Sequence, residues 1–436
     1  MRTSRRDFVQ RATAFAAAGA FGLIALREDA IQRVAAAGQK HAATPPEQLA
    51  GDEDFWFQIQ QAFAIDRSVI NLNNGGISPS PRVVQDAFRR HLEFANQLPA
   101  RNLWHVQDPQ VEHVRTGLAR LFGCAVDEMA ITRNASESLE TCLLGFDLKA
   151  GDEVLTTDLD YPRMISTIRQ RELREGIKLV QIKIEPPVND VQEIVAAYAA
   201  AITPRTKLIL ASHVVFITGQ IQPIADIVKL GRERGIPVIV DGAHAFAHVP
   251  FKRDDIDCDY YGVSLHKWLT APHGTGFLYV RKERIAGLWP LMAAEKPQSD
   301  NIRKFEEIGT HPAATRLAIA EAITLFETIG AQRKYARLCH LRRRWSERIA
   351  SDKRVHFYTK LDPASAGGFV TFSIDGVDMR KLHEHLWAQH KMFTVCVEHA
   401  KVLSLRISPN VYTTIGEVDQ FAEAIESVIA SGLPTV

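Results

Sequence analysis

Short apolar segments rich in β-branched residues recur along the chain up to residue 280, and polar turn residues bound each of them. Seven segments predict strands, at residues 128–132, 153–157, 178–184, 207–212, 237–240, 260–263 and 276–280. Segments with helical periodicity lie between most of these strands, such as 135–145, 163–175 and 224–234. Strands that are almost continuously apolar and alternate with helices predict an α/β fold with a mostly parallel sheet covered on both faces. Such sheets bind ligands at the carboxyl ends of their strands.

The pattern changes after Gly309-Thr310. A long helical stretch is predicted from residue 313 to about 349, followed by strands at 368–374, 394–397 and 402–407 and helices at 379–390 and 415–430. These elements predict a second, smaller α+β domain. We therefore divide the chain into a leader (1–37), an N-terminal segment (38–75), a large α/β domain (76–310) and a C-terminal part with a long helix and a small α+β domain (311–436).

The leader has the pattern of an export signal. Residues 4–9 (SRRDFV) form a twin-arginine pattern, and the apolar run 12–26 that follows is shorter than the roughly 20 residues that span a bilayer. The small residues at 34–38 (VAAAG) offer a cleavage site, which we place after Ala37. We expect the twin-arginine translocon to carry the folded, cofactor-loaded chain to the periplasm, with no stable membrane span. The alternative for this segment is a buried or frayed N-terminal helix.

Composition narrows the class of protein. The 436 residues are too many for one small core, and 46% hydrophobic and 24% charged residues are ordinary values for a soluble globular protein. With 52 basic and 51 acidic residues, the chain has no general positive field, so we expect no nucleic-acid partner. The five cysteines contain no CxxC pair, which argues against a zinc ribbon or a disulfide framework, and we expect no metal site.

Candidate chemistry is concentrated at the ends of two predicted strands. Residues 237–244 (PVIVDGAH) form a buried strand that ends on Asp241, and residues 259–268 (DYYGVSLHKW) form a second strand that ends near Lys267. Lone aspartates and lysines are usually surface charges, but a carboxylate and a lysine that converge at strand ends suggest a site for pyridoxal 5'-phosphate (PLP). The lysine amine forms a Schiff base with the cofactor aldehyde. The carboxylate keeps the pyridine nitrogen protonated, so that the ring accepts electrons.

These motifs strongly resemble the class V aminotransferase family of fold type I PLP enzymes, and they are most similar to its isopenicillin N epimerase branch. The resemblance covers residues from about 70 to the end. It implies the PLP-dependent transferase fold type I, with a large sheet of the seven-stranded type and a small C-terminal α+β domain. It further implies that Lys267 is the Schiff-base lysine and proton shuttle, that Asp241 pairs with the pyridine nitrogen, and that His244 lies near the phenolic oxygen.

The resemblance also implies a set of contacts to the cofactor's phosphate and ring. Ser264 and His266 are expected at the phosphate, as are Ala135 and Ser136, which open a helix after a predicted strand. Tyr161 matches the position of the residue that stacks on the pyridine ring, where the family more commonly has His. Without the lysine site, Ser136 is an ordinary helix N-cap and His266 is a buried histidine bonded to the backbone.

Three further residues extend the resemblance to the substrate and to a second subunit. Thr310 matches the family threonine that reaches the phosphate of the neighbouring subunit, which implies a homodimer with shared active sites. Arg406 matches the arginine that grips the substrate α-carboxylate, a group that a planar guanidinium binds in bidentate fashion. The alternative for Arg406 is a surface residue at a strand end. Asn74 in the segment 73–76 (NNGG) is expected in the substrate pocket.

The resemblance implies a reaction at the amino group or Cα of an amino acid or an amino-acid unit of a peptide-like metabolite. An external aldimine forms with the substrate amine, and Cα deprotonation by Lys267 gives a quinonoid carbanion. Epimerisation, amine transfer and elimination remain open. Phe216 and Ile217 stand where many relatives carry polar pocket residues, so the family's substrate specificity does not transfer directly.

Two other functions remain open. A cysteine desulfurase-like C–S lyase requires a mobile cysteine, but Cys396 lies in a segment, 394–397, that alternates like a strand and favours a buried small residue. A non-catalytic exported ligand-binding protein on the same fold is the second alternative. The intact pair of Asp241 and Lys267 argues against it, because capture of a ligand needs no electron sink.

Overall fold

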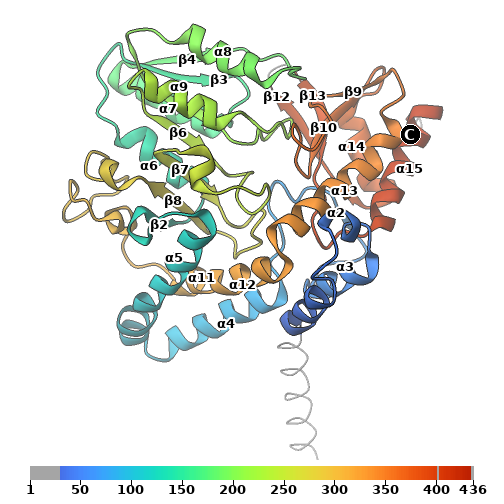
Figure 1. Cartoon of the computed structure of the whole chain (residues 1–436), viewed down its shortest axis with the longest axis horizontal. Coiled ribbons are helices and arrows are strands. Elements are labelled where there is room, and N and C mark those ends of the chain that lie inside the picture. Colours follow the sequence, from blue (N-terminus) through green and yellow to red (C-terminus); the bar gives the residue numbers. More distant parts are fainter. Residues whose placement is uncertain (1–29, 400–401, 434–436) are drawn as a thin grey trace, which may run out of the picture.

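The computed structural model describes residues 30–399 and 402–433 (Figure 1). The twin-arginine pattern and the apolar run of the leader lie outside this part of the chain. Residues 30–40 are helical, with Val34 fully buried in the main hydrophobic core, and Arg333 donates hydrogen bonds to the carbonyls of Gly38 and His41. The expected cleavage position at Ala37 therefore falls within a helix that packs against the body. Within the described ranges, no helix is long and apolar enough to cross a membrane.

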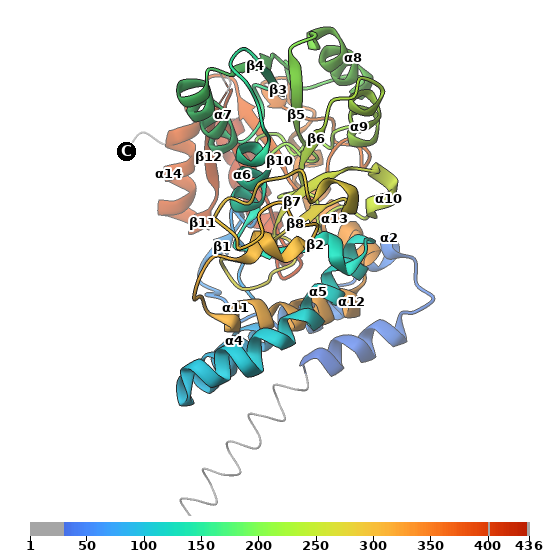
Figure 2. The same cartoon turned by 90° about the vertical axis from the view of Figure 1, so that its left-hand side faces the viewer.

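A seven-stranded sheet forms the centre of the large domain (Figures 1 and 2). β8 is antiparallel to both of its neighbours, and the other four strand pairs are parallel. In spatial order the strands are β2 (Met129–Thr132), β8 (Gly276–Val280), β7 (Tyr260–Ser264), β6 (Val238–Asp241), β5 (Thr206–Ser212), β3 (Glu153–Thr157) and β4 (Lys178–Ile182). The predicted mostly parallel sheet is thereby confirmed. Asp241 is the last residue of β6 and therefore lies at the carboxyl edge of the sheet.

Successive side chains of the central strands enter two different cores, which is why the strands are apolar on both faces. In β6, for example, Val238 and Val240 pack in one core and Ile239 in the other. The first core is covered by α5 (Asp108–Phe122), α8 (Val191–Ala201) and α9 (Ile224–Glu233), and the second by α6 (Ala135–Gly145) and α7 (Pro162–Glu175). α5, which precedes the first predicted strand, was not among the predicted elements.

The helical stretch predicted from 313 to 349 is three helices and not one. They are α11 (Ala313–Leu317), α12 (Ile319–Ile329) and α13 (Ala331–Ile349). Gly330 separates the last two with a φ of 89°, a left-handed conformation that favours glycine and ends a helix. α11 and α12 pack on α4 (Arg82–Gln97), which leads through a π-helical segment (Arg101–Gln107) into α5, and α13 continues into the small domain (Figure 1).

The small domain is built on a four-stranded antiparallel sheet with the order β12, β13, β10 and β9. Its elements are β9 (Val355–Phe357), β10 (Val370–Ile374), α14 (Met379–His390), β12 (Val395–His399), β13 (Val402–Ile407) and α15 (Ile415–Ser431). The N-terminal segment joins this domain: α2 (Pro46–Leu49) packs on α13 and α3 (Glu53–Gln60) follows, while β1 (Ile70–Asn71) pairs in parallel with β11 (Met392–Phe393). The chain after β1 then crosses to the large domain at the junction of the two domains, and we call residues 73–76 the crossing segment.

Candidate active site

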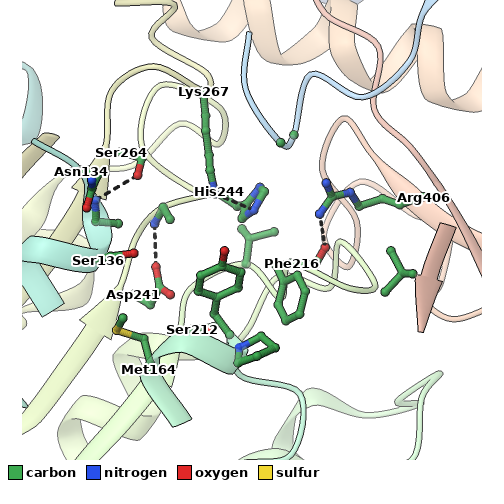
Figure 3. A pocket seen from close by; sticks show the side chains of 18 of the residues that line it. Asn134, Ser136, Met164, Ser212, Phe216, Asp241, His244, Ser264, Lys267 and Arg406 are labelled. Carbon is green, nitrogen blue, oxygen red and sulfur yellow. Dashed lines mark hydrogen bonds between the residues drawn. The ribbon is translucent and has the colours of Figure 1, made fainter. Parts of the chain in front are cut away.

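The carboxyl ends of β2, β3, β5, β6 and β7 meet at one edge of the large sheet, where a cavity of about 500 Å³ opens (Figure 3). The small domain closes its other side with β12 and with Arg406 of β13, and Gly75 and Gly76 after β1 complete the wall. Nine of the residues expected from the sequence line this cavity: Ala135, Ser136, Tyr161, Asp241, His244, Ser264, His266, Lys267 and Arg406. Residues that are far apart in the chain are therefore brought together by the parallel sheet and by the docking of the small domain.

The carboxylate of Asp241 is buried and has little contact with solvent. Its side chain is 8% exposed, and Oδ1 accepts a 2.9 Å hydrogen bond from the N–H of Ala243. Burial raises the pKa of Asp241 to about 6, against the lowering effects of that hydrogen bond and of the Lys267 ammonium, and the charge of Asp160 raises it further. A group with this environment binds a proton or a positively charged partner readily.

The side chains of Lys267 and His244 lie next to each other in the cavity wall (Figure 3). The Lys267 Nζ lies 3.0 Å from His244 Nε2. Burial lowers the pKa of Lys267 to about 8, and Arg406 lowers it further while Asp241 opposes the change. Burial together with the Lys267 charge holds the pKa of His244 well below its usual range, so its ring is neutral. A buried amine with a lowered pKa is a nucleophile and base near neutral pH.

The start of α6 and the end of β7 form a polar corner of the cavity. Asn134 caps α6, with its side chain accepting from the N–H of Glu137. The Ser264 hydroxyl oxygen accepts from the N–H of Ala135 at 2.9 Å, which leaves the hydroxyl proton available to an anion (Figure 3). Ser136, in the first turn of α6, also lines the cavity. Free donors and the helix dipole at this end favour a phosphate.

His266 reaches the same cavity but is bonded to the backbone on one side. Its Nδ1 lies 3.2 Å from the carbonyl oxygen of Thr275, so Nδ1 carries the proton and Nε2 is an acceptor in the neutral ring. Burial and the Lys267 charge lower the pKa of His266 to about 4. His266 is thus tied to the backbone, as the alternative interpretation expected, and it also lines the cavity, while its contact with the phosphate stays a prediction.

The opposite wall is mostly apolar. Tyr161, at the start of α7, is 42% exposed and packs edge-on against Phe216 with ring centroids 5.2 Å apart. Val214, Phe216 and Met164 line the cavity beside it. Ile217 does not, because its side chain is fully buried in the core.

Arg406 comes from the small domain and is 6% exposed. Its Nη1 donates to the carbonyl of Phe216 at 2.8 Å (Figure 3). Its Nη2 donates to Asn73 Oδ1 at 3.1 Å. Among the described residues, its buried Nε has no hydrogen-bond partner. A guanidinium on a cavity wall is suited to an anionic group such as a carboxylate.

Two expected site residues lie elsewhere. Asn74 does not line the cavity: its side chain is fully buried and bonds to the carbonyls of Asn71 and Ser408 and to the Tyr412 hydroxyl, so it fixes the crossing segment to the small domain. Thr310 is exposed on a separate surface depression that also includes Trp104.

Cys396 takes the orientation expected of a strand residue. In β12, Val395 and Val397 pack against the main core, and Cys396 between them packs against the core of the small domain. Cys396 is also among the residues that line the cavity. Burial raises the pKa of the Cys396 thiol, so the reactive thiolate is disfavoured.

Sequence reasoning missed the groups that support these residues. Asp160, 2% exposed, accepts hydrogen bonds from Thr156, Thr157 and Ser212 and lies close enough to Asp241 to influence it. Asn73, and not its neighbour Asn74, holds Arg406. The doublet Asn73-Asn74 and the run Leu159-Asp160-Tyr161 were visible signals. Within residues 30–399 and 402–433, no group of three or more His, Cys, Asp or Glu side chains is arranged to hold a metal.

Comparison with known proteins places this geometry among related chains. The family model described as aminotransferase class-V matches residues 70–421. Isopenicillin N epimerase of Streptomyces clavuligerus is 31% identical over 399 residues, which cover 86% of this chain and 98% of the relative. A probable cysteine desulfurase of Vibrio cholerae serotype O1 is 25% identical over 396 residues, which cover 86% of this chain and 96% of the relative. The apo structure of cysteine desulfurase from Thermococcus onnurineus NA1 has the same fold, with a TM-score of 0.76, 22% identity and coverage of 86% of this chain and 98% of that one.

Proposed function

This chain belongs to the aminotransferase class-V family and its cofactor is PLP, and we propose that it acts at the amino group or Cα of an amino acid or of an amino-acid unit in a peptide-like metabolite. One observation carries the proposal: Lys267, Asp241 and Arg406, from two domains, line a single cavity. The similarity to an isopenicillin N epimerase favours epimerisation, with amine transfer as the other outcome of the same site.

The residues present fit the cofactor. Asp241 would hold the pyridine nitrogen, because a raised pKa marks a carboxylate that gains from a positively charged partner. Ser264, Ser136 and the N–H groups at the start of α6 would hold the phosphate. His244 has a buried Nδ1 with no partner among the described residues, and it would lie at the phenolic oxygen. Tyr161 would cover one ring face.

PLP, when bound, supplies an electron sink for a carbanion at the substrate Cα. Lys267 takes the Cα proton and returns it, because its amine is buried and its pKa is lowered to about 8. Arg406 would orient the substrate through its carboxylate, because its guanidinium lies at the cavity wall and is fixed by the bonds to Phe216 and Asn73. Val214, Phe216 and Met164 exclude water from the reacting atoms and favour an uncharged substrate side chain.

We propose that the active enzyme is a homodimer in the periplasm, exported by the twin-arginine translocon. Thr310 is exposed outside its own chain's cavity, so it serves as a phosphate ligand only for a partner subunit. The pattern at residues 4–9 supports the export route. Two measurements test these proposals: sedimentation of the purified chain, which should give a dimer, and fractionation of cells, which should place the protein in the periplasm.

A cysteine desulfurase-like C–S lyase is the alternative at the same site, because Cys396 borders the cavity. The side chain of Cys396 packs toward the small-domain core, which disfavours the alternative. Release of sulfide from cysteine that is lost in Cys396→Ser would establish the lyase.

The experiment begins with the near-visible absorption spectrum of the PLP-loaded protein beside that of Lys267→Ala. We expect a band in the wild type that borohydride removes, and no such band in the variant. Exchange of the substrate α-proton in D₂O is then followed by NMR. The panel consists of L- and D-amino acids and of peptides with a free N-terminal amine. Exchange with inversion supports an epimerase, and appearance of a keto acid supports an aminotransferase. A wild type without the band after incubation with PLP refutes the proposal.

A further inference from the structure

Three buried rings lie beside His244 and Lys267 at the junction of the two domains. They belong to His248, Trp268 and Phe369, which are at most 1% exposed, and we call them the ring stack. The His248 ring lies parallel to Trp268 with centroids 4.0 Å apart and an angle of 15°, and Trp268 is inclined by 18° to Phe369 at 5.8 Å. Phe369 in turn contacts the His244 ring at 5.3 Å.

His248 makes one hydrogen bond with each ring nitrogen, and its partners fix its tautomer. Nδ1 lies 2.7 Å from the carbonyl oxygen of His244, an acceptor, so Nδ1 carries the proton. Nε2 accepts a 2.6 Å hydrogen bond from the backbone N–H of Gly368, so Nε2 is unprotonated. Only the neutral Nδ1–H ring satisfies both partners.

We propose that His248 is a positioning residue for Lys267: it holds His244 by the main-chain carbonyl, holds Trp268 by stacking, and ties both to Gly368 of the small domain. His244 is the residue whose Nε2 meets the Lys267 amine at 3.0 Å, and Trp268 directly follows Lys267 in the chain. The Lys267 amine is thereby held in two ways: His244 fixes the position of its hydrogen-bond partner, and Trp268 fixes the backbone next to it. Lys334, 3% exposed, donates a further hydrogen bond to the Trp268 carbonyl.

The small-domain partner of His248 is built for a close approach of backbone. A Cβ on Gly367 would lie 2.5 Å from His248 Cε1, and one on Gly368 would lie 2.6 Å from Leu338 Cβ. No side chain fits at either position. The next residue, Phe369, lies 5.9 Å from the Arg406 guanidinium, measured to the ring centroid. The peptide that binds His248 thus also supports the arginine that faces the cavity.

A direct catalytic role does not explain His248. It is not among the residues that line the cavity. Burial lowers its pKa to about 3, with Lys334, Arg342 and His213 adding to the effect and the bond to His244 opposing it, so the ring is not a proton donor at neutral pH. The role that remains is structural: His248 joins His244, Gly368 and Trp268 through two hydrogen bonds and one stacking contact.

Two variants separate the two hydrogen bonds. In His248→Asn the amide N–H₂ can replace the Nδ1 donor to His244, but nothing replaces the acceptor for Gly368. In His248→Gln the longer side chain can place its amide oxygen near Gly368, but the donor to His244 is lost. Phe421→Leu is the matched control, because Phe421 is fully buried in the small-domain core and makes no contact with the ring stack.

The test uses the full-length chain and PLP, and it needs no substrate. This inference rests on the cofactor site of the proposed function. We measure the rate at which PLP-free protein gains the borohydride-sensitive near-visible band, and the pH midpoint of that band. In both His248 variants we expect capture to be slower by roughly tenfold or more, because a lysine amine that is no longer held spends most of its time in unproductive rotamers. We also expect the pH midpoint to move by about half a unit or more.

The outcomes distinguish this inference from the proposed function. A wild type without the band refutes the proposed function itself. A wild type with a normal band, and His248 variants that match it in capture rate and pH midpoint, refute the role of His248 alone. Equal changes in Phe421→Leu reduce the effect to a loss of stability and also overturn the inference.

If both variants fail to fold, the wild type still decides. With ¹⁵N-histidine labelling, the His248 ring should show the neutral Nδ1–H tautomer without titration between about pH 5 and 9. A ring protonated at Nε2, or one that titrates in this range, contradicts the proposed connections.

Discussion

Replacement of Asp241 by Asn should stabilise the PLP-free protein while it disables the cofactor site. Asp241 is 8% exposed, and the only hydrogen bond to its carboxylate among the described residues comes from the N–H of Ala243. The pKa of this carboxyl is raised from the ordinary 3.8 to about 6, mainly by burial. Ionisation of Asp241 in the folded chain therefore costs free energy. The neutral amide of Asn avoids this cost.

The size of the effect follows from the shift. A pKa raised by about two units corresponds to about 3 kcal/mol at neutral and alkaline pH. Because folding raises this pKa, the carboxyl contributes no penalty below 3.8, and stability is lost as the pH rises through about 6. The Asn oxygen can still accept from Ala243, but its buried N–H₂ lacks a partner, which costs about 1 kcal/mol. We expect Asp241→Asn to be more stable than wild type by about 2 kcal/mol at pH 8, with a smaller difference near pH 5.

The assay is urea unfolding of PLP-free protein followed by tryptophan fluorescence at several pH values. Asp160→Asn is the matched control, because Asp160 is a second buried carboxylate at the same sheet edge but accepts four hydrogen bonds. Its replacement should destabilise the protein. If Asp241→Asn lowers stability at pH 8 as Asp160→Asn does, the argument from desolvation is wrong. Exchange of the substrate α-proton should also be lost in Asp241→Asn, because the neutral amide cannot hold a proton on the ring nitrogen and the ring is then a weaker electron sink.

Three further predictions concern single residues. Arg406→Met should raise KM for a carboxylate substrate by roughly 100-fold with a smaller change in kcat, because a buried charge-assisted contact is lost, and steady-state kinetics with a substrate and its amide analogue measure this. Cys396→Ser should leave amine chemistry unchanged, since its side chain packs toward the small-domain core; a loss of turnover contradicts that orientation. Gly219→Ala should lower the free energy of unfolding by about 2 kcal/mol or more, because φ is 80° and the new Cβ would lie 2.2 Å from the Phe369 carbonyl oxygen; an unchanged urea midpoint refutes this.

The central sheet was predictable because its strands are buried on both faces. Runs such as 237–240 are apolar at every position, and that pattern has few solutions other than a covered parallel sheet. The position of Asp241 followed, since the first polar residue after such a run lies at the carboxyl edge of the sheet, whereas Lys267 lies three residues beyond the end of β7 and was identified by its motif. By contrast, α5 carries mixed polar and apolar residues, and the break at Gly330 interrupts an otherwise continuous helical pattern.

The residue sequence thus determined the fold class, the strand ends that carry the candidate chemistry, and the resemblance to a PLP family. Tertiary structure decided which side chains meet. Asn73 and Asn74 are adjacent and chemically identical, yet only Asn73 holds Arg406, because the crossing segment turns Asn74 into the small-domain contact. Thr310 lies away from its own cavity, and His248 joins the two domains through Gly368. Such pairings depend on how two domains dock, and a docking contact between residues 120 positions apart leaves no local pattern in a single sequence.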